Sequence, residues 1–87
     1  MLFHYPMIVH AEDGYWAEFP DLEGCNAWGD TLEELFGDAE GSMICHICSI
    51  LADGETLPVS SDPHKILADE TSFVVMMSGD INLNLEN

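Results

Sequence analysis

A stripe of apolar residues at three- and four-residue steps, beginning at Leu32, constrains the fold of this chain more than any other feature. Such spacing is typical of a helix that buries one face. The stripe consists of Leu32, Leu35, Phe36, Ala39, Met43, Ile47, Ile50 and Leu51. Asp30 and Thr31 precede it, and each is followed three residues later by a glutamate, which makes a doubled capping-box pattern. The sequence Ala-Asp-Gly at 52–54 ends the segment, so we predict one helix over residues 32–51.

Two segments near the start of the chain have the composition of paired β-strands. Residues 3–11 are rich in β-branched and aromatic side chains, although Pro6 removes an amide donor and favours an edge or a bulge. The sequence Glu-Asp-Gly at 12–14 is a hairpin signal, and Tyr-Trp-Ala-Glu-Phe follows it as a second strand. We therefore predict a hairpin at the start of the chain.

The stretch FPDLEGCNAWGDT at 19–31 admits two interpretations, a catalytic loop that presents Cys25 and Asp21 or a piece of scaffold. A turn at 20–24, a short third strand at 25–28 and a helix cap together account for its distinctive residues. Cys25 has acidic and no basic neighbours in the sequence, which raises the pKa of a thiol and disfavours a nucleophile. We interpret the stretch as scaffold and expect no catalytic residue in it.

The part of the chain after the helix is predicted to be a loop followed by strands. Residues 55–65 contain two prolines and are predicted as a loop. Residues 72–78, Ser-Phe-Val-Val-Met-Met-Ser, are continuously apolar in their centre and suit a strand that is buried on both faces. Gly-Asp at 79–80 is a possible turn, and apolar and polar residues alternate in the segment that follows it, 81–86.

The charge of the chain excludes several classes of function. One lysine, no arginine and 17 acidic residues give a net charge of −16. Nucleic-acid binding needs cationic contacts with phosphate, so we expect no direct binding of DNA or RNA. An anionic membrane surface is excluded for the same reason. The charge indicates either a basic protein partner or simple solubility, and both interpretations stay open.

Other features of the sequence indicate a single cytoplasmic domain. The 87 residues allow one domain. Residues 1–10 lack the cationic start and the long apolar run of a signal peptide. We find no apolar run of the about 20 residues that span a bilayer. The odd number of cysteines, three, argues against a disulfide scaffold.

Two groups of residues have the composition of metal or redox sites. Cys45 and Cys48 have the spacing of a ligand or redox pair, but they lie inside the predicted helix rather than at its N-terminus, and packing is the preferred interpretation. His4 and His10 share a parity on the first strand, and with Glu18 across the hairpin they form a possible metal or proton site. We interpret them as ordinary surface histidines and predict no metal and no cofactor.

Several runs of the sequence, taken together, resemble the HicB family of antitoxins. They are the Tyr-Pro pair at 5–6, the run EDGYWAEFPDLEGCNAWGDTLEEL, and the later run LADGETLPVSS. The resemblance covers the chain from Tyr5 to about Ser60 and is most specific over 19–31.

The resemblance implies an α+β fold with a three-stranded antiparallel meander, one long helix packed on the sheet, and a fourth strand beside the first. This arrangement is partly RNase H-like. The resemblance also implies a role, which is to bind the small, basic HicA toxin, an mRNA interferase, and to cover its catalytic histidine. No catalytic activity is implied for the chain itself. We assign residues 1–79 to this domain and 80–87 to a C-terminal strand or tail.

The chain departs from the family pattern at three places. Family members often continue into a C-terminal operator-binding region, whereas this sequence ends at Asn87, so operator binding is not expected. Glu23 stands where the family usually has proline. Gly37 and Gly41 interrupt the predicted helix and either permit close approach of another backbone or are tolerated weak points.

Three hypotheses follow for the function. The leading one is a toxin-neutralising antitoxin, and the second is a stand-alone HicB-like homo-oligomer with a regulatory or ligand-binding role. The third, a metal-dependent hydrolase that uses His4, His10 and nearby acids, has the least support. For the first hypothesis, the candidate toxin contacts are Glu12, Asp13, Glu18, Asp21 and Glu23, which we expect to cluster at the hairpin and the following turn.

The end of the sequence predicts self-association. Ile81, Leu83 and Leu85 alternate with polar residues and have no later element to cover them. A strand edge leaves amides and carbonyls unpaired, and the segment has no lysine or proline that would protect it. We therefore expect these three residues to form an oligomer interface, in the simplest case a two-fold dimer.

Overall fold

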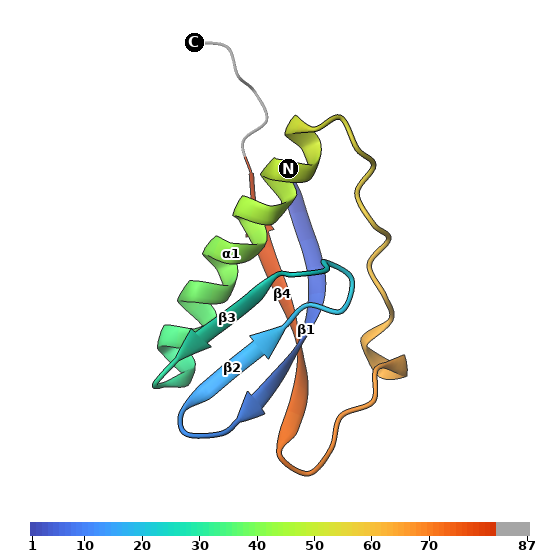
Figure 1. Ribbon diagram of the computed structural model, residues 1–87. Coiled ribbons are helices and arrows are strands. Elements are labelled where there is room, and N and C mark those ends of the chain that lie inside the picture. The colour runs from blue at the N-terminus through green and yellow to red at the C-terminus, as the bar shows by residue number, and fades with distance from the viewer. Residues whose placement is uncertain (82–87) are drawn as a thin grey trace.

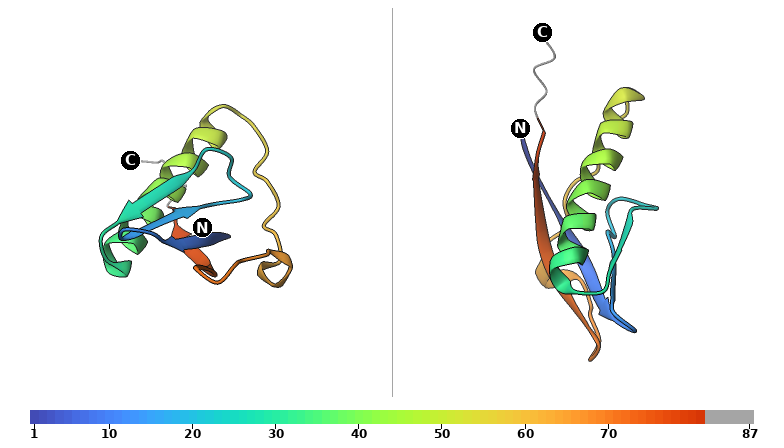
Figure 2. Two further views of the ribbon diagram at one scale, coloured as in Figure 1. Left: turned by 60° about the horizontal axis from the view of Figure 1, so that its bottom comes forward. Right: turned by 90° about the vertical axis from the view of Figure 1, so that its left-hand side faces the viewer.

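The computed structural model describes residues 1–81 and contains one antiparallel sheet and one long helix (Figure 1). The elements are β1 (Leu2–Ala11), β2 (Tyr15–Glu18), β3 (Asn26–Gly29), α1 (Leu32–Ala52), the short 3₁₀ turn η1 (Pro63–Lys65) and β4 (Ser72–Asp80). The strand order is β3-β2-β1-β4, and α1 lies across one face of the sheet (Figure 2). The predicted α+β fold, with the fourth strand beside the first, is confirmed.

Helix α1 begins where the capping residues predict, although the capping bonds form only at Thr31, and Glu34 reaches the Asp30 amide rather than that of Thr31. The Thr31 hydroxyl accepts a hydrogen bond from the Glu34 amide at 3.1 Å. The Glu34 carboxylate in turn accepts from the amide of Asp30, at 3.0 Å. Two amides that have no partner inside the helix are thereby satisfied. At the other end, Gly54 takes a φ of +75°, which suits a glycine just past a helix.

The core lies between α1 and the strand residues that point toward it. Leu35, Ala39, Met43 and Ile47 are fully buried and occupy one stripe of α1. They belong to the same core as Met7, Val9, Ala17 and Ala27 of the first three strands, all 0% exposed. Because side chains alternate along a strand, this burial identifies the face of the sheet that the helix covers.

Gly29 sets how closely α1 approaches the sheet. A Cβ added at Gly29 would lie 2.8 Å from the Cα of Leu35, which is shorter than real Cβ contacts. The obstructing atoms belong to the helix backbone and cannot rotate away. Only glycine therefore allows the first turn of α1 to pack at this distance from the end of β3.

Strand β1 accommodates Pro6 because its partner on one side is short. β1 pairs with β4 along most of its length, but with β2 only over residues 8–11. The Ala11 amide donates to the Thr71 carbonyl on the β4 side at 3.1 Å. Since amides alternate between the two sides of a strand, the Pro6 nitrogen points to the other side, where β2 does not reach. The proline was expected at an edge or a bulge, whereas β1 is an inner strand and Pro6 lies at a position that β2 does not reach.

The loop between α1 and β4 passes along this unpaired part of β1 (Figure 1). The Tyr5 hydroxyl donates to the Pro58 carbonyl at 2.6 Å, and Ser61 donates to Asp21 of the β2–β3 turn. Pro6 is less than 2% exposed. The loop is therefore fastened to the sheet, and it protects an edge that Pro6 cannot pair.

Strand β4 differs from the prediction in two respects. It was expected to be buried on both faces, but Met76, on the face opposite α1, is 42% exposed. Phe73 pairs with the core residue Val9 and is still 40% exposed, because β4 is an edge strand. The expected turn at 79–80 is also wrong. Gly79 and Asp80 continue β4 and pair with Phe3 and Leu2 of β1.

The predicted oligomer interface is only partly within the described residues. Ile81 donates its amide to the Met1 carbonyl at 2.8 Å, and its side chain is 8% exposed in the core. For Ile81, the premise of an uncovered apolar face is therefore wrong. Leu83 and Leu85 lie outside the described residues.

Within the described part of the chain, α1 is the one helix whose length and mean hydropathy, 1.2, would allow it to cross a membrane. A core helix of a globular domain meets the same criterion. The buried stripe of α1 packs on the sheet, and Glu33 and Glu34 occupy its first turn. We interpret α1 as a core helix.

Candidate functional site

The five acidic residues predicted as toxin contacts do not form one cluster. Glu12 and Asp13 lie in the β1–β2 hairpin, whereas Asp21 and Glu23 lie in the β2–β3 turn. These two turns lie at opposite ends of β2 (Figure 1). In the hairpin, both Asp13 and Gly14 have a positive φ, of +49° and +99°. Glu12, Asp13 and Glu23 are exposed, so their carboxylates face solvent.

Asp21 has a structural role within the chain. Its two carboxylate oxygens accept hydrogen bonds from Ser61, one from the amide at 2.7 Å and one from the hydroxyl at 2.6 Å. Burial, together with the nearby charge of Asp21, raises the pKa of the Tyr5 hydroxyl. Asp21 therefore holds the long loop against the sheet, and its carboxylate is already occupied.

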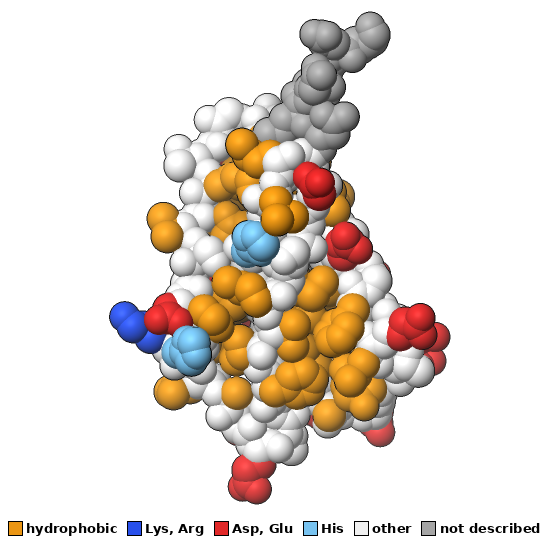
Figure 3. Space-filling model, turned by 180° about the vertical axis from the view of Figure 1, so that it is seen from behind, with side chains coloured by type: hydrophobic (Ala, Val, Ile, Leu, Met, Phe, Trp, Pro, Cys, Tyr) orange, Lys and Arg blue, Asp and Glu red, His pale blue; other side chains and the backbone are white. Residues whose placement is uncertain are grey.

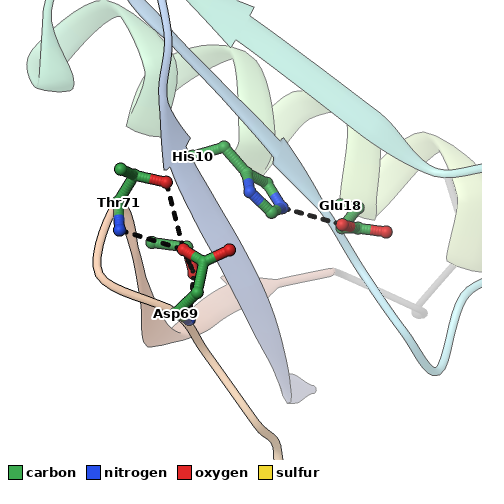
Figure 4. A network of polar contacts seen from close by, with 5 residues as sticks. His10, Glu18, Asp69 and Thr71 are labelled. Carbon is green, nitrogen blue, oxygen red and sulfur yellow. Dashed lines mark hydrogen bonds and ion pairs between the residues drawn. The ribbon is translucent and has the colours of Figure 1, made fainter.

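Glu18 takes part in a small polar network with His10 (Figure 4). The His10 Nε2 and a Glu18 carboxylate oxygen are 2.8 Å apart. The His10 ring also stacks on Trp16, with ring centroids 4.2 Å apart and an interplanar angle of 14°. The predicted proximity of His10 and Glu18 is confirmed, but His4 instead contacts the Ser78 hydroxyl at 2.8 Å. Across residues 1–81, no three histidine, cysteine or acidic side chains are placed to hold a metal ion.

Asp69 lies on the other side of β1 from Glu18 in the same region (Figure 4). A hydrogen bond from the Thr71 amide lowers the pKa of Asp69, and the hydroxyls of Ser72 and Thr71 and the charge of His10 add to this effect. This carboxylate is exposed and stays charged. His10 therefore has an acidic group on each side.

The three cysteines have different environments. Cys25 is buried, and burial, with a smaller effect of Cys45, raises the pKa of its thiol to about 11. Such a thiol is protonated at neutral pH and is a poor nucleophile. Cys45 and Cys48 are exposed on α1. The interpretation of Cys25 as part of the scaffold agrees with its place in the core.

A groove of about 580 Å³ runs between the start of β3 and the solvent-facing side of α1. Gly37, Gly41 and Cys45 of α1 line it, together with Cys25 and Asn26. A Cβ added at Gly37 or Gly41 would meet no atom within 4 Å. In the described structure these glycines therefore do not serve close approach of another backbone.

The face of the sheet opposite α1 carries several exposed or half-buried apolar side chains. Trp28 is 61% and Met76 42% exposed, and Ile8, Trp16 and Val74 are half-buried. The register places them on one face, because Trp16 pairs with Trp28 and Ile8 pairs with Val74. Figure 3 shows hydrophobic side chains gathered on this side of the molecule, with acidic side chains around the margin. We call Ile8, Trp16, Trp28, Val74 and Met76 the open-face patch.

The open-face patch was not predicted from the sequence, although part of its pattern is visible in β2 and β3. In Tyr-Trp-Ala-Glu and Asn-Ala-Trp-Gly, each tryptophan is adjacent to an alanine. Ala17 and Ala27 face the helix, so alternation places Trp16 and Trp28 on the other side. The pairing of Trp16 with Trp28 then puts both tryptophans on one face, and this register is not encoded in either strand alone.

A hollow of about 440 Å³ adjoins the patch at the end of the sheet near the β1–β2 hairpin. Its lining combines the two tryptophans with acidic residues, namely Glu12, Asp13, Tyr15, Trp16, Trp28, Gly29, Asp30 and Glu34. Glu34 is engaged with the Asp30 amide, whereas Glu12 and Asp13 are exposed hairpin residues. The hollow can accept a cationic side chain, because aromatic rings and carboxylates both attract cations.

The family comparison gives one match that covers most of the chain. A family model described as "HicB_like antitoxin of bacterial toxin-antitoxin system" matches residues 5–85. The chain is also 40% identical, over 58 residues, to a 14.9 kDa protein from the rep-hol intergenic region of Haemophilus phage HP1. That alignment covers 66% of this chain and 44% of the phage protein, so the chain spans less than half the length of this relative.

Two solved structures resemble the chain over most of its length. A chain of the "HicA3 and HicB3 toxin-antitoxin complex" is 27% identical with a TM-score of 0.74, and the match covers 91% of this chain and 100% of that one. A chain of a toxin–antitoxin complex from Streptococcus pneumoniae has a TM-score of 0.83 at 18% identity, covering 100% of this chain and 78% of that one. The second likeness shows the fold alone.

Proposed function

This chain belongs to the HicB-like antitoxins of bacterial toxin–antitoxin systems, and from that membership we propose that it binds and occludes a small basic toxin of the HicA type in the cytoplasm. The observation that carries the proposal is the family match over residues 5–85. The likeness to a chain of a toxin–antitoxin complex supports it. The net charge of −16 also suits a basic partner.

The proposed mechanism is occlusion by binding rather than catalysis. Cys25, the cysteine of the loop-rich stretch before α1, is buried and has a pKa of about 11, which disfavours nucleophilic chemistry. Glu12, Asp13 and Glu23 are exposed and free to attract a cationic surface. Glu18 and Asp21, by contrast, already contact His10 and Ser61. We therefore give the first three acids priority as candidate toxin contacts.

The test of this function is to look for a small basic open reading frame beside the gene of this chain and to co-express it with this chain. Expression of that reading frame alone should stop growth, and co-expression with this chain should restore it. Purification of the two proteins as one complex would add physical evidence. A neighbouring gene that is absent or harmless would contradict the proposal and favour a stand-alone HicB-like oligomer with a regulatory role.

The electrostatic part of the proposal predicts a salt-dependent association rate. Exposed charges steer the encounter and are screened beyond about 8 Å at physiological ionic strength. The variant with Glu12→Gln, Asp13→Asn and Glu23→Gln should associate more slowly and with a weaker dependence on salt. Stopped-flow or surface-based kinetics measure both quantities, and an unchanged salt dependence would remove these three acids from the mechanism.

Self-association through Leu83 and Leu85 is a separate part of the proposal. Truncation at Ser78 is a poor test, because it removes Ile81 from the core. Sedimentation of Leu83→Asp and Leu85→Asp variants avoids that difficulty. A wild-type chain that sediments as a monomer at moderate salt would contradict this part of the proposal, whereas loss of a dimer in the variants would support it.

A further inference from the structure

The open-face patch is an apolar surface that no element of the described chain covers. α1 packs on the opposite face of the sheet, and the patch residues do not take part in the core on that side. Trp28 exposes 61% of its surface, which is costly for so large an aromatic side chain in a monomer. A contiguous exposed apolar patch on a small protein usually marks an interaction surface.

The patch contains features that favour a protein partner. Trp28, Trp16 and His10 lie side by side across three neighbouring strands, and the last two rings are stacked. Tryptophan is enriched among the residues that dominate interface energies. An exposed indole also accepts a lysine or arginine over its face. The surface is therefore suited to a partner that combines apolar and cationic side chains.

Acidic groups lie beside the patch. Glu12 and Asp13 share the hollow with Trp16 and Trp28, and Glu18 is the cross-strand neighbour of Ile8. Asp69 lies on the other side of β1 from Glu18, beyond His10 (Figure 4). Figure 3 shows acidic side chains around the margin of the hydrophobic area. A partner with lysine or arginine around an apolar centre would match both parts of this surface.

A second copy of the chain matches this surface poorly. Each copy carries a net charge of −16, and face-to-face association would bring the same acidic margins together. Lys65, the one lysine or arginine of the sequence, lies in η1 and cannot neutralise two acidic margins. Charge therefore favours a basic partner over a copy of the same chain.

We infer that the open-face patch, centred on Trp28, is the docking surface for the cationic partner protein. This inference rests on the proposed function, since the toxin supplies that partner. The aromatic centre contributes most of the affinity, and the acidic margin contributes the association rate. Of the contacts predicted from charge alone, Glu12, Asp13 and Glu18 therefore lie beside the binding surface and not at its centre.

The composition of the chain provides a direct probe of the patch. The sequence has two tryptophans, and both belong to the patch, so intrinsic fluorescence reports on this face. The probe is a small basic HicA-type protein found by the co-expression test and purified in a catalytically inactive form. On adding it, we expect the emission to shift to shorter wavelength and the quenching by acrylamide to decrease. A tryptophan-free variant of the basic protein removes its own signal.

Substitutions then locate the surface. Trp28→Ser should weaken the affinity by about 30-fold, which is typical of an aromatic side chain at the centre of an interface. Met76→Ser should weaken it less, and it serves as a second variant if Trp28→Ser folds poorly. Val59→Ser is the matched control, because Val59 is 88% exposed in the loop between α1 and η1 and its loss should leave the affinity unchanged. Circular dichroism checks the fold of each variant.

The outcomes separate this inference from the proposed function. If the wild-type chain binds the basic protein and both patch variants bind equally well, the inference is overturned while the proposed function stands. If the wild-type chain does not bind, both fail. In the absence of the basic protein, acrylamide quenching could decrease as the concentration of the chain is raised. If it does, and if Trp28→Ser abolishes that decrease, the patch binds a second copy and the inference is overturned.

Discussion

The two faces of the sheet are built from alternate residues of the same strands, yet they have opposite properties. On the covered face, Ala17 and Ala27 are 0% exposed beneath α1. One residue away, Trp16 is half-buried and Trp28 is 61% exposed. The small residues are inside and the large aromatic residues are outside. Hydrophobicity alone therefore does not identify the covered face.

Side-chain size explains this arrangement. Alanine and glycine beneath α1 let the helix approach the sheet, so that Leu35, Met43 and Ile47 fill the remaining space. A tryptophan on the covered face would hold the helix away. The residues of the covered face must therefore be small enough for close packing with the helix. The open face has no such limit, and it carries large aromatic side chains of the kind that contribute strongly to binding a partner.

The largest effect is expected for Gly29→Ala. The added Cβ would collide with the backbone of Leu35, so α1 must move away from the sheet, and we expect a loss of more than about 4 kcal/mol and little folded protein. Gly37→Ala is the control, because an added Cβ there meets no atom within 4 Å, and it should stabilise the helix by about 0.5–1 kcal/mol. Urea unfolding measures both. A Gly29→Ala variant of wild-type stability would contradict the close packing described here.

A pair of methionines compares the two faces directly. Met43 is fully buried on α1, and Met43→Ala should cost about 2–5 kcal/mol. Met76 is 42% exposed on the open face, and Met76→Ala should cost less than about 1 kcal/mol. Thermal or urea unfolding distinguishes the two values. Equal losses would mean that the open face contributes to the fold as much as the covered face does.

A smaller effect is expected at the loop that passes the unpaired part of β1. Both carboxylate oxygens of Asp21 accept hydrogen bonds from Ser61. Asp21→Asn replaces one of these oxygens with an NH₂ group and removes the charge, so it should lower the free energy of unfolding by about 1–2 kcal/mol. Glu23→Gln, in the same turn but exposed, should change stability by less than about 0.5 kcal/mol. Hydrogen exchange of the loop amides would show whether the Asp21 variant loosens that segment. If both variants had the same stability, Asp21 would be a surface residue like Glu23.

The smallest effect expected is a loss of stability at alkaline pH, caused by ionisation of a buried thiol on the covered side of the sheet. Folding raises the pKa of Cys25 from 9.0 to about 11, so the buried thiol favours the folded state while it is protonated. This contribution is complete below pH 9 and is lost as the pH rises to about 11. Tyr5, whose pKa is also raised, acts in the same direction.

The unfolding midpoint should therefore fall across that pH range, and Cys25→Ala should reduce the slope. Cys48→Ala, at an exposed position, should not. An identical slope in the wild-type chain and in Cys25→Ala would show that the Cys25 thiol titrates in the folded state as it does in the unfolded one.

Local signals account for the parts of the fold that the sequence predicted well. The helix was expected over 32–51 and spans Leu32–Ala52, because caps and periodicity are encoded within the segment itself. The open-face patch was missed, because a four-residue strand does not reveal which parity faces the helix. The bond between Asp21 and Ser61 joins residues 40 apart, and no local pattern predicts it. The burial of β4 was overestimated because its edge position depends on the strand order.

The pairing of β1 with β4 has a consequence for the order in which the chain assembles. This ladder joins Leu2 to Asp80, whereas β1, β2, β3 and α1 are connected by short turns. Closing a long loop costs more entropy and slows folding, so we expect the hairpin, β3 and α1 to form first and β4 to be added last. Pulsed hydrogen exchange during refolding would show this as late protection of the β4 amides. Met77 and Gly79, which lie against the core and α1, would then join a domain whose other strands already hold the helix in place.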